Sequence, residues 1–250
     1  MRTLKLVVAY DGTEYAGWQL QPNGVSVQQV LEKAIETVLG PHRTIVAGRT
    51  DAGVHALGQV VSLRTGLDPD RGELLRALNA NLPLDVVVRS IDEVPNEFDP
   101  VRSAIGKLYR YRFYDGAVRP VLERNFVWQV WNLDWGAMAE AAPLLRGTHD
   151  FSSFRDAGSQ AATSVRTIDR IELIRAPPSA EREVWLEVEG PGFLKHMVRN
   201  LAGTLFQVGR RFHPPAWVSE VLAARDRKRA GPTAPARGLT LVEVRYPPST

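Results

Sequence analysis

The chain has 250 residues, of which 44% are hydrophobic and 24% are charged, and it contains no cysteine. This balance is typical of a folded protein with one large or two smaller domains, and it excludes extended disorder. The lack of cysteine excludes disulfides, thiolate nucleophiles and cysteine-ligated metal centres. No apolar run approaches the roughly 20 residues of a membrane-spanning helix, so we expect a cytoplasmic protein without membrane contact.

Charge is distributed unevenly along the chain. The net charge is +3, yet from Pro191 onward ten Lys or Arg face three acidic residues, which leaves +7 there and −4 in the rest. Most of these cations are arginines, whose planar guanidinium suits phosphate and stacks on bases. A polyanionic partner is therefore plausible, with the cluster Arg225–Arg229 as one contact. Charge alone is equally compatible with a solvated basic end.

The first part of the chain alternates strand and helix patterns. An apolar stripe after Ser26, with Gln29 three residues on and Gly40 at its end, is typical of a capped amphipathic helix. A second helix is expected from Asp68-Pro69. The predicted strands are Leu4–Tyr10, Thr44–Ala47, Gln59–Leu63 and Val86–Ile91.

The later part repeats a similar order of elements. Helices are expected at Asp134–Leu145, around the apolar stripe from Leu194 to Leu205, and around Trp217–Leu222. The predicted strands are Lys107–Tyr114, Asn125–Trp131, Thr167–Arg175, Glu183–Glu189 and Leu239–Arg245.

Strands joined by loops favour antiparallel pairing, and the amphipathic helices then cover one face of each sheet. We therefore predict an α+β fold with two related halves. The first half, residues 1–102, carries an Asp51 loop, and the second half, residues 103–250, carries an aromatic strand and a basic helix.

The densest set of reactive side chains lies in the segment Gly48–His55. It brings the guanidinium of Arg49, the carboxylate of Asp51 and the imidazole of His55 into one loop between two predicted strands. Glycines permit backbone angles that other residues resist, so such a loop can aim Asp51 into a cleft. The same residues also suit an ordinary turn closed by the aspartate side chain.

Asp51 is compatible with several kinds of chemistry. An aspartate can act as a nucleophile, a general base or a metal ligand. No second carboxylate lies in this loop, which argues against glycosidase chemistry with paired carboxylates. No further ligand cluster accompanies Asp51 and His55, so we expect no metal. A nearby cation would favour the ionised, nucleophilic carboxylate.

The segment Lys107–Phe113 alternates aromatic and basic residues. As a strand it places Tyr109, Tyr111 and Phe113 on one face and two arginines on the other. Aromatic faces beside cations are typical of proteins that bind single-stranded RNA. The alternative is a sheet face that buries its aromatics in the core, and we favour this alternative for Tyr111 and Phe113.

A third candidate is the glycine loop and helix start at Gly190–Asn200. Helical periodicity assigns Met197 and Val198 to the core and leaves Lys195, His196 and Arg199 as informative residues. The loop lacks the third glycine of a dinucleotide-binding fingerprint, so we reject a Rossmann site. For Arg199 taken by itself, we favour the interpretation as a surface charge.

Together these segments resemble the tRNA pseudouridine synthase A family, with Gly48–Ala56 similar to its catalytic motif. Arg237 stands at a position where the family varies. Further similarity extends over nearly the whole chain, through Asp11–Thr13, Gly17–Gln19, Lys107–Tyr111, Gly147–Phe154, Phe193–Asn200 and Ala234–Leu239.

The resemblance implies an isomerase that converts uridines 38, 39 and 40 of the tRNA anticodon stem-loop to pseudouridine, as a homodimer. It implies a pseudouridine synthase fold whose two sheets join across a central cleft. It also implies that Asp51 is the nucleophile, that Tyr109 stacks on the target uracil, that Arg199 pairs with Asp51, and that Arg49 occupies the space left by the flipped base.

The implied reaction moves the ribosyl bond from N1 to C5 of uracil, which conserves atoms and oxidation state. No cofactor, metal or second substrate is therefore expected. The carboxylate can add at C6 of the base or at C1′ of the sugar, and Tyr109 is a possible base for the C5 proton; the sequence leaves both points open. Two other functions remain possible, a noncatalytic RNA-binding protein and a hydrolase of a glycosidic bond in nucleic acid.

Overall fold

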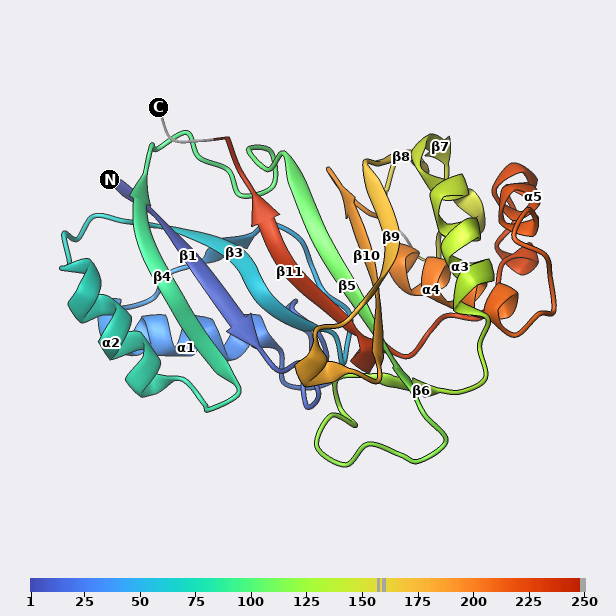
Figure 1. Ribbon diagram of the computed structural model, residues 1–250. Coiled ribbons are helices and arrows are strands. Elements are labelled where there is room, and N and C mark those ends of the chain that lie inside the picture. The colour runs from blue at the N-terminus through green and yellow to red at the C-terminus, as the bar shows by residue number, and fades with distance from the viewer. Residues whose placement is uncertain (157, 159–160, 248–250) are drawn as a thin grey trace. The chain divides into compact units, whose positions relative to one another are not determined.

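The computed structural model describes residues 1–156, 158 and 161–247. It divides into two units: unit 1 is Met1–Ile105 with Thr240–Thr250, and unit 2 is Gly106–Leu239 (Figure 1). We predicted a single cut after residue 102. The contacts instead return the last segment of the chain to unit 1, because its strand pairs there.

Unit 1 is built on an antiparallel sheet in which β1 (Arg2–Tyr10) lies between β4 (Val86–Val94) and β3 (His55–Thr65). The short strand β2 (Thr44–Val46) also pairs with β3. The last strand, β11 (Leu239–Arg245), runs parallel to the start of β3. The predicted strands of this half are confirmed, and β3 begins four residues before the predicted start.

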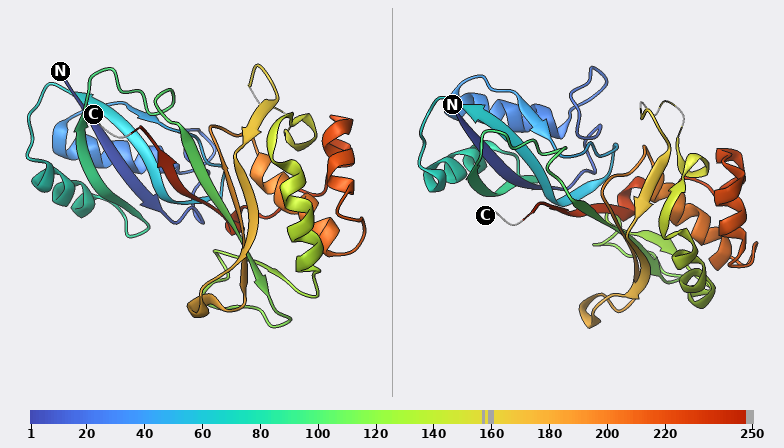
Figure 2. Two further views of the ribbon diagram at one scale, coloured as in Figure 1. Left: turned by 45° about the horizontal axis from the view of Figure 1, so that its top comes forward. Right: turned by 90° about the horizontal axis from the view of Figure 1, so that it is seen from above.

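The two helices of unit 1 lie on one face of its sheet (Figures 1 and 2). Helix α1 (Val27–Leu39) begins where Ser26 accepts a 3.2 Å hydrogen bond from the Gln29 amide, and it ends at Gly40 with φ of +82°. Helix α2 (Arg71–Asn81) is capped by Asp70 in the same way. Both predicted helices are confirmed, and they bury Leu31, Ile35, Leu74 and Leu78 in the core.

In unit 2, β10 (Glu183–Gly190) lies between β5 (Gly106–Asp115) and β9 (Arg170–Arg175) and is antiparallel to both. The strand β6 (Trp128–Val130) is shorter than predicted and runs parallel to β5. The segment predicted as one strand at Thr167–Arg175 forms two. The first of them, β8 (Val165–Ile168), pairs with β7 (Gly147–Asp150), a strand that the sequence reading missed.

Among its described residues, unit 2 has three α-helices. Helix α4 (Met197–Gly209) packs against α3 (Trp135–Ala141) and β5, and α5 (Trp217–Ala224) completes this layer. Helix α3 is shorter than predicted because Pro143 falls in the following 3-10 turn, Ala142–Leu145. The remaining 3-10 turns are Ser152–Phe154, Pro178–Ala180, Arg227–Arg229 and Ala236–Gly238.

Each unit therefore combines mainly antiparallel strands with helices, which confirms the predicted α+β class. The register of β5 on β10 buries Tyr111 and Phe113 completely, and Phe113 lies 5.7 Å from Trp128 between ring centroids. Within the described residues, every helix falls short of the length and apolar content needed to cross a bilayer.

Candidate functional site

The Asp51 loop of unit 1 connects β2 to β3 and is held to the neighbouring loop by backbone hydrogen bonds. The Trp18 amide donates to the Thr50 carbonyl at 3.0 Å, and the Gly53 amide donates to the Tyr15 carbonyl at 3.3 Å. The Val54 amide donates to the carbonyl of Asp51 itself at 3.1 Å. The backbone on both sides of Asp51 is therefore fixed by partners.

A buried polar cluster supports this loop from the core side. The hydroxyls of Tyr10 and Thr50 lie 2.7 Å apart, and both side chains are buried. The Gln59 amide donates to the Tyr10 hydroxyl at 3.4 Å and to the Gly48 carbonyl at 2.8 Å. Burial raises the pKa of Tyr10 to about 12, so its hydroxyl keeps its proton at neutral pH.

Two glycines allow the Gly12–Trp18 segment to approach the Asp51 loop closely. Gly17 has φ of +101°, and a Cβ there would lie 2.8 Å from the Thr50 carbonyl oxygen. A Cβ on Gly12 would lie 2.0 Å from the Val54 carbonyl oxygen. Any larger side chain would push the two segments apart, so these glycines are required for the shape of the site.

The contacts of His55 connect two segments of the chain to each other. Its side chain is buried, and Nδ1 lies 3.0 Å from the Gly12 amide and 3.1 Å from Asp11 Oδ1. The ring thereby connects the start of β3 to the loop after β1. Across the described residues there is no group of three or more His, Cys, Asp or Glu that could hold a metal ion.

Asp51 is partly exposed at the surface of this braced loop, and Arg49 of the same loop is exposed. The buried Thr50 between them turns inward, so its neighbours on either side face outward. A carboxylate that solvent can reach, on a backbone held by hydrogen bonds, is suited to attack a bound substrate.

In unit 2 the predicted base-stacking residue, Tyr109, lies on β5 with 8% of its surface exposed. Its ring meets Phe193 edge-to-face, with the centroids 5.3 Å apart. Tyr111 and Phe113, on the same face of the strand, are fully buried. The core interpretation of Tyr111 and Phe113 is thus confirmed, and neither of these two rings is open for stacking.

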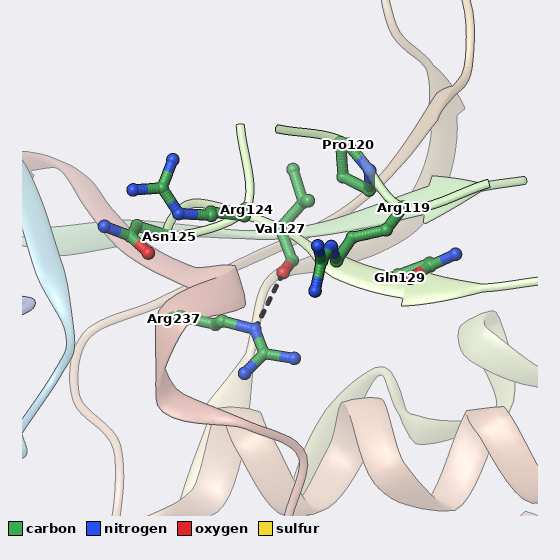
Figure 3. A pocket seen from close by; sticks show the side chains of 7 residues that line it. All are labelled: Arg119, Pro120, Arg124, Asn125, Val127, Gln129 and Arg237. Carbon is green, nitrogen blue, oxygen red and sulfur yellow. Dashed lines mark hydrogen bonds between the residues drawn. The ribbon is translucent and has the colours of Figure 1, made fainter. Parts of the chain in front are cut away.

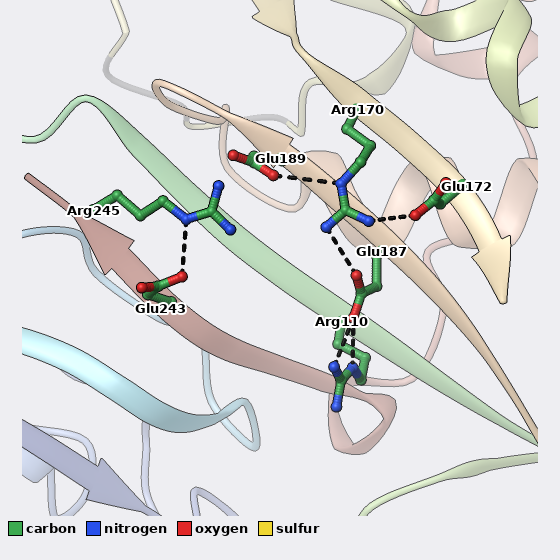
Figure 4. Close-up of polar contacts among 7 residues, drawn as sticks. All are labelled: Arg110, Arg170, Glu172, Glu187, Glu189, Glu243 and Arg245. Atoms are coloured by element: carbon green, nitrogen blue, oxygen red, sulfur yellow. Dashed lines mark hydrogen bonds and ion pairs between the residues drawn. The ribbon is translucent and has the colours of Figure 1, made fainter. Parts of the chain in front are cut away.

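The two arginines of this strand are engaged in ion pairs on the opposite face. Arg110 contacts Glu187 at 2.6 Å, and its guanidinium lies 3.8 Å from the centre of the Trp185 ring. Arg112 pairs with Glu183 at the same distance. Figure 4 shows that Arg170 joins this network by pairing with Glu187, so the face balances its own charge.

Arg199 lies in the first turn of α4 and is fixed by a reciprocal contact. Its Nε donates to the Ala234 carbonyl at 2.8 Å, and the Ala234 amide donates to the Arg199 carbonyl at 3.2 Å. The chain passes closely here, since a Cβ on Gly203 would lie 1.7 Å from the Pro232 carbonyl oxygen. Lys195 and His196, the other candidates of this segment, both lie near the Asp156 carboxylate.

A second arginine, Arg227, holds the loop that carries Ala234. Its guanidinium donates to the Gly231 carbonyl at 2.9 Å and to Asn200 Oδ1 and Thr233 Oγ1 at 3.0 Å each. We expected the whole cluster Arg225–Arg229 to face RNA. Arg227 instead has an internal structural role.

The structure therefore places Asp51 and Arg49 together in one loop of unit 1, and Tyr109 and Arg199 in unit 2. The residues that sequence reasoning missed are those that support them, chiefly Tyr10, Gln59 and Arg227. A strand-ending tyrosine and a core glutamine are weak signals, because polar residues in predicted strands are common.

Comparison with known proteins gives the family. A family model described as tRNA pseudouridine synthase matches residues 6–101 and 141–247. The chain belongs to the tRNA pseudouridine synthase family. It is thereby an enzyme of the isomerase class, and the resemblance inferred from its motifs is confirmed.

Relatives named tRNA pseudouridine synthase A match this member of the family along nearly its full length. The relative from Myxococcus xanthus is 49% identical over 98% of this chain and 92% of its own. The one from Geobacter sulfurreducens is 47% identical over 98% of this chain and 100% of its own. A crystal structure of the archaeal box H/ACA sRNP Nop10-Cbf5 complex covers 91% of this chain and 60% of its own, at 13% identity and a TM-score of 0.32, too distant to add to the assignment.

Proposed function

We propose that this chain isomerises uridines 38, 39 and 40 of the tRNA anticodon stem-loop to pseudouridine. The observation that carries the proposal is the partly exposed Asp51 carboxylate, on a loop braced from both sides, in a member of this family. The reaction breaks the N1–C1′ bond and forms a C5–C1′ bond. The proton lost from C5 is matched by one gained at N1, so no external reductant or oxidant is needed.

Asp51 acts as the nucleophile in this proposal and must be ionised to do so. Arg199 pairs with it and favours the charged carboxylate. The support for Arg199 is its fixed geometry: the Nε bond to the Ala234 carbonyl orients a planar guanidinium whose fork suits a carboxylate.

The target base leaves its stack before it reacts, which costs a few kcal/mol. Tyr109 offsets part of this cost by stacking on the uracil, and its edge contact with Phe193 holds the ring in one orientation beforehand. Arg49 is exposed on the same loop as Asp51, and it occupies the space that the flipped base leaves.

Two further parts of the proposal are that the enzyme acts as a homodimer and that it works in the cytoplasm. The dimer is tested by sedimentation, where the expected mass is twice the 27.8 kDa of the chain. A monomer at micromolar concentration that retains full activity would contradict the dimer.

The main test uses tRNA labelled with tritium at uridine C5, because isomerisation releases that label as water. We expect release by the native chain, no release by Asp51→Asn, and retained tRNA binding in this variant. A matched control is Asp92→Asn, since Asp92 is an exposed carboxylate of unit 1 that pairs with Lys5 at 3.3 Å. The control should release tritium at the native rate.

The other functions predict different products. No release from any tRNA, with binding intact, indicates a noncatalytic RNA-binding protein, and free uracil indicates a hydrolase. Substrates with a single uridine at 38, 39 or 40 test the positions. The rate should be unchanged by EDTA, and a rate restored only by added metal contradicts the proposed chemistry.

A further inference from the structure

Unit 2 contains a cavity of about 240 Å³ that the proposed mechanism does not use. It lies where the loop between β5 and β6 meets the 3-10 turn Ala236–Gly238 (Figure 3). Liquid water takes up about 30 Å³ per molecule, so the space admits a phosphate-sized group with several waters. Its lining residues are Arg119, Pro120, Arg124, Asn125, Val127, Gln129 and Arg237.

Three of these lining residues are arginines. No described residue that lines the cavity is acidic. Arg119, Arg124 and Arg237 are all exposed. Arg124 donates to the Val121 carbonyl, and Arg237 donates to the Val127 carbonyl at 3.2 Å. These contacts orient the two guanidinium groups without neutralising their charge, because a backbone carbonyl carries none.

The loop that carries two of the arginines is fixed at its ends. The Gln129 side chain donates to the carbonyls of Gly116 and Ala117 at 3.0 and 3.2 Å, and the Gly116 amide donates to the Val130 carbonyl at 2.9 Å. The nearby Asp115 carboxylate accepts from the Trp135 indole at 2.8 Å. The backbone that carries the cationic groups is thus ordered before a ligand binds, which reduces the entropy lost on binding.

We propose that this cavity is a subsite for a backbone phosphate of the RNA substrate, bound by Arg119, Arg124 and Arg237. Guanidinium groups bind phosphate oxygens through charge-assisted and often bidentate hydrogen bonds. A polyanion also relieves the mutual repulsion of three like charges around one space. The choice of RNA over a small free anion rests on the proposed function, since a tRNA enzyme must position a phosphate backbone.

Arg119 gives the cleanest test, because it makes no hydrogen bond or ion pair within the described residues and its substitution removes only a charge. We expect Arg119→Gln to raise the Kd for tRNA about threefold or more, and to reduce the slope of log K against log salt by about 1. Arg119→Lys should recover part of the affinity. Arg146→Gln is the matched control, since Arg146 is an exposed arginine of unit 2 outside the cavity.

The double variant Arg119→Gln/Arg124→Gln should bind tRNA more weakly still, and the effect should be seen mainly as a higher Kd and a higher KM. Equal losses in Arg119→Gln and Arg146→Gln would show that only net charge matters and would overturn the subsite. So would native affinity and salt slope in the double variant. Titration with inorganic phosphate at constant ionic strength distinguishes an RNA phosphate from a small free anion. If the double variant loses phosphate binding but binds tRNA as the native chain does, the cavity is a site for small anions and not for RNA.

The tritium assay on the native chain separates this proposal from the function on which it rests. If the native chain releases tritium but the cavity variants bind tRNA normally, the subsite alone is wrong. If tRNA binding depends on the cavity but the native chain releases no tritium, the proposed function is wrong and the subsite stands.

Discussion

The hydroxyl of Tyr10 lies 2.7 Å from the hydroxyl of Thr50, the residue directly before Asp51. This bond joins the end of β1 to the Asp51 loop through the core of unit 1. The position of the carboxylate therefore depends on a tyrosine that is buried in the core.

Tyr10→Phe should lower both stability and turnover. It leaves Thr50 and Gln59 without their buried hydroxyl partner, which costs about 1–2 kcal/mol and loosens the loop. The free energy of unfolding in urea and the rate of tritium release measure the two effects. Tyr246→Phe is the control: its hydroxyl donates to the Pro100 carbonyl at 2.8 Å, away from the loop, so stability should fall while turnover stays native.

The pH dependence of stability should also differ between native chain and Tyr10→Phe. Burial raises the pKa of Tyr10 to about 12 from 10.0, so folding favours its protonated form. This contribution is fully present below pH 10 and is lost as pH rises toward 12, by at most about 1.4 kcal/mol per pH unit. The stability difference between the two proteins, measured in urea from pH 8 to 12, should shrink above pH 10. A constant difference would contradict the buried environment of this hydroxyl.

Gly17→Ala should reduce turnover through a steric contact with the Asp51 loop. The positive φ alone costs about 1–2 kcal/mol, and the new Cβ would also lie 2.8 Å from the Thr50 carbonyl oxygen. Gly40→Ala isolates the first effect, because Gly40 has φ of +82° and open space around it. We expect Gly17→Ala to be the less stable of the two, and the only one whose kcat falls, by about tenfold or more.

Substitutions of Arg227 and Arg229 should distinguish a structural arginine from one that binds tRNA. Arg227→Gln removes the donors to Gly231, Asn200 and Thr233, so we expect a loss of about 1–3 kcal/mol in unfolding free energy and a lower kcat. Arg229 is exposed. Arg229→Gln should leave the free energy of unfolding unchanged and weaken tRNA binding. Equal effects of the two substitutions on stability would show that the Arg227 contacts contribute little.

The elements that could be predicted are those whose signal is local. Helix α1 has a capping serine, an apolar stripe and a terminal glycine within its own sequence, and all three act as expected. Strand β7 has four residues and too little alternation to be noticed, and it exists because β8 pairs with it. The predicted α3 extends too far because its apolar pattern continues through Pro143, where only a 3-10 turn forms.

The candidate site likewise has a part that the sequence predicts and a part that it does not. Asp51 could be found because its motif is contiguous, whereas its support comes from Tyr10 and Gln59 on neighbouring strands. The ion pairs of Arg110 and Arg112 depend on how β5 pairs with β10, which places Glu187 opposite Arg110. Alternation along one strand shows which side chains share a face, but it does not show their partners on the next strand.

The strand β11 has a consequence for how the protein matures during synthesis. Thr240 and Leu241 pair with His55 and Ala56, directly after the Asp51 loop, and a Cβ on Gly58 would lie 2.6 Å from the Val242 carbonyl oxygen. A nascent chain that has emerged only through β5 lacks this neighbour. The segment directly after the Asp51 loop thus gains this neighbour only once β11 has been synthesised and has left the ribosome, long after β3 itself has emerged.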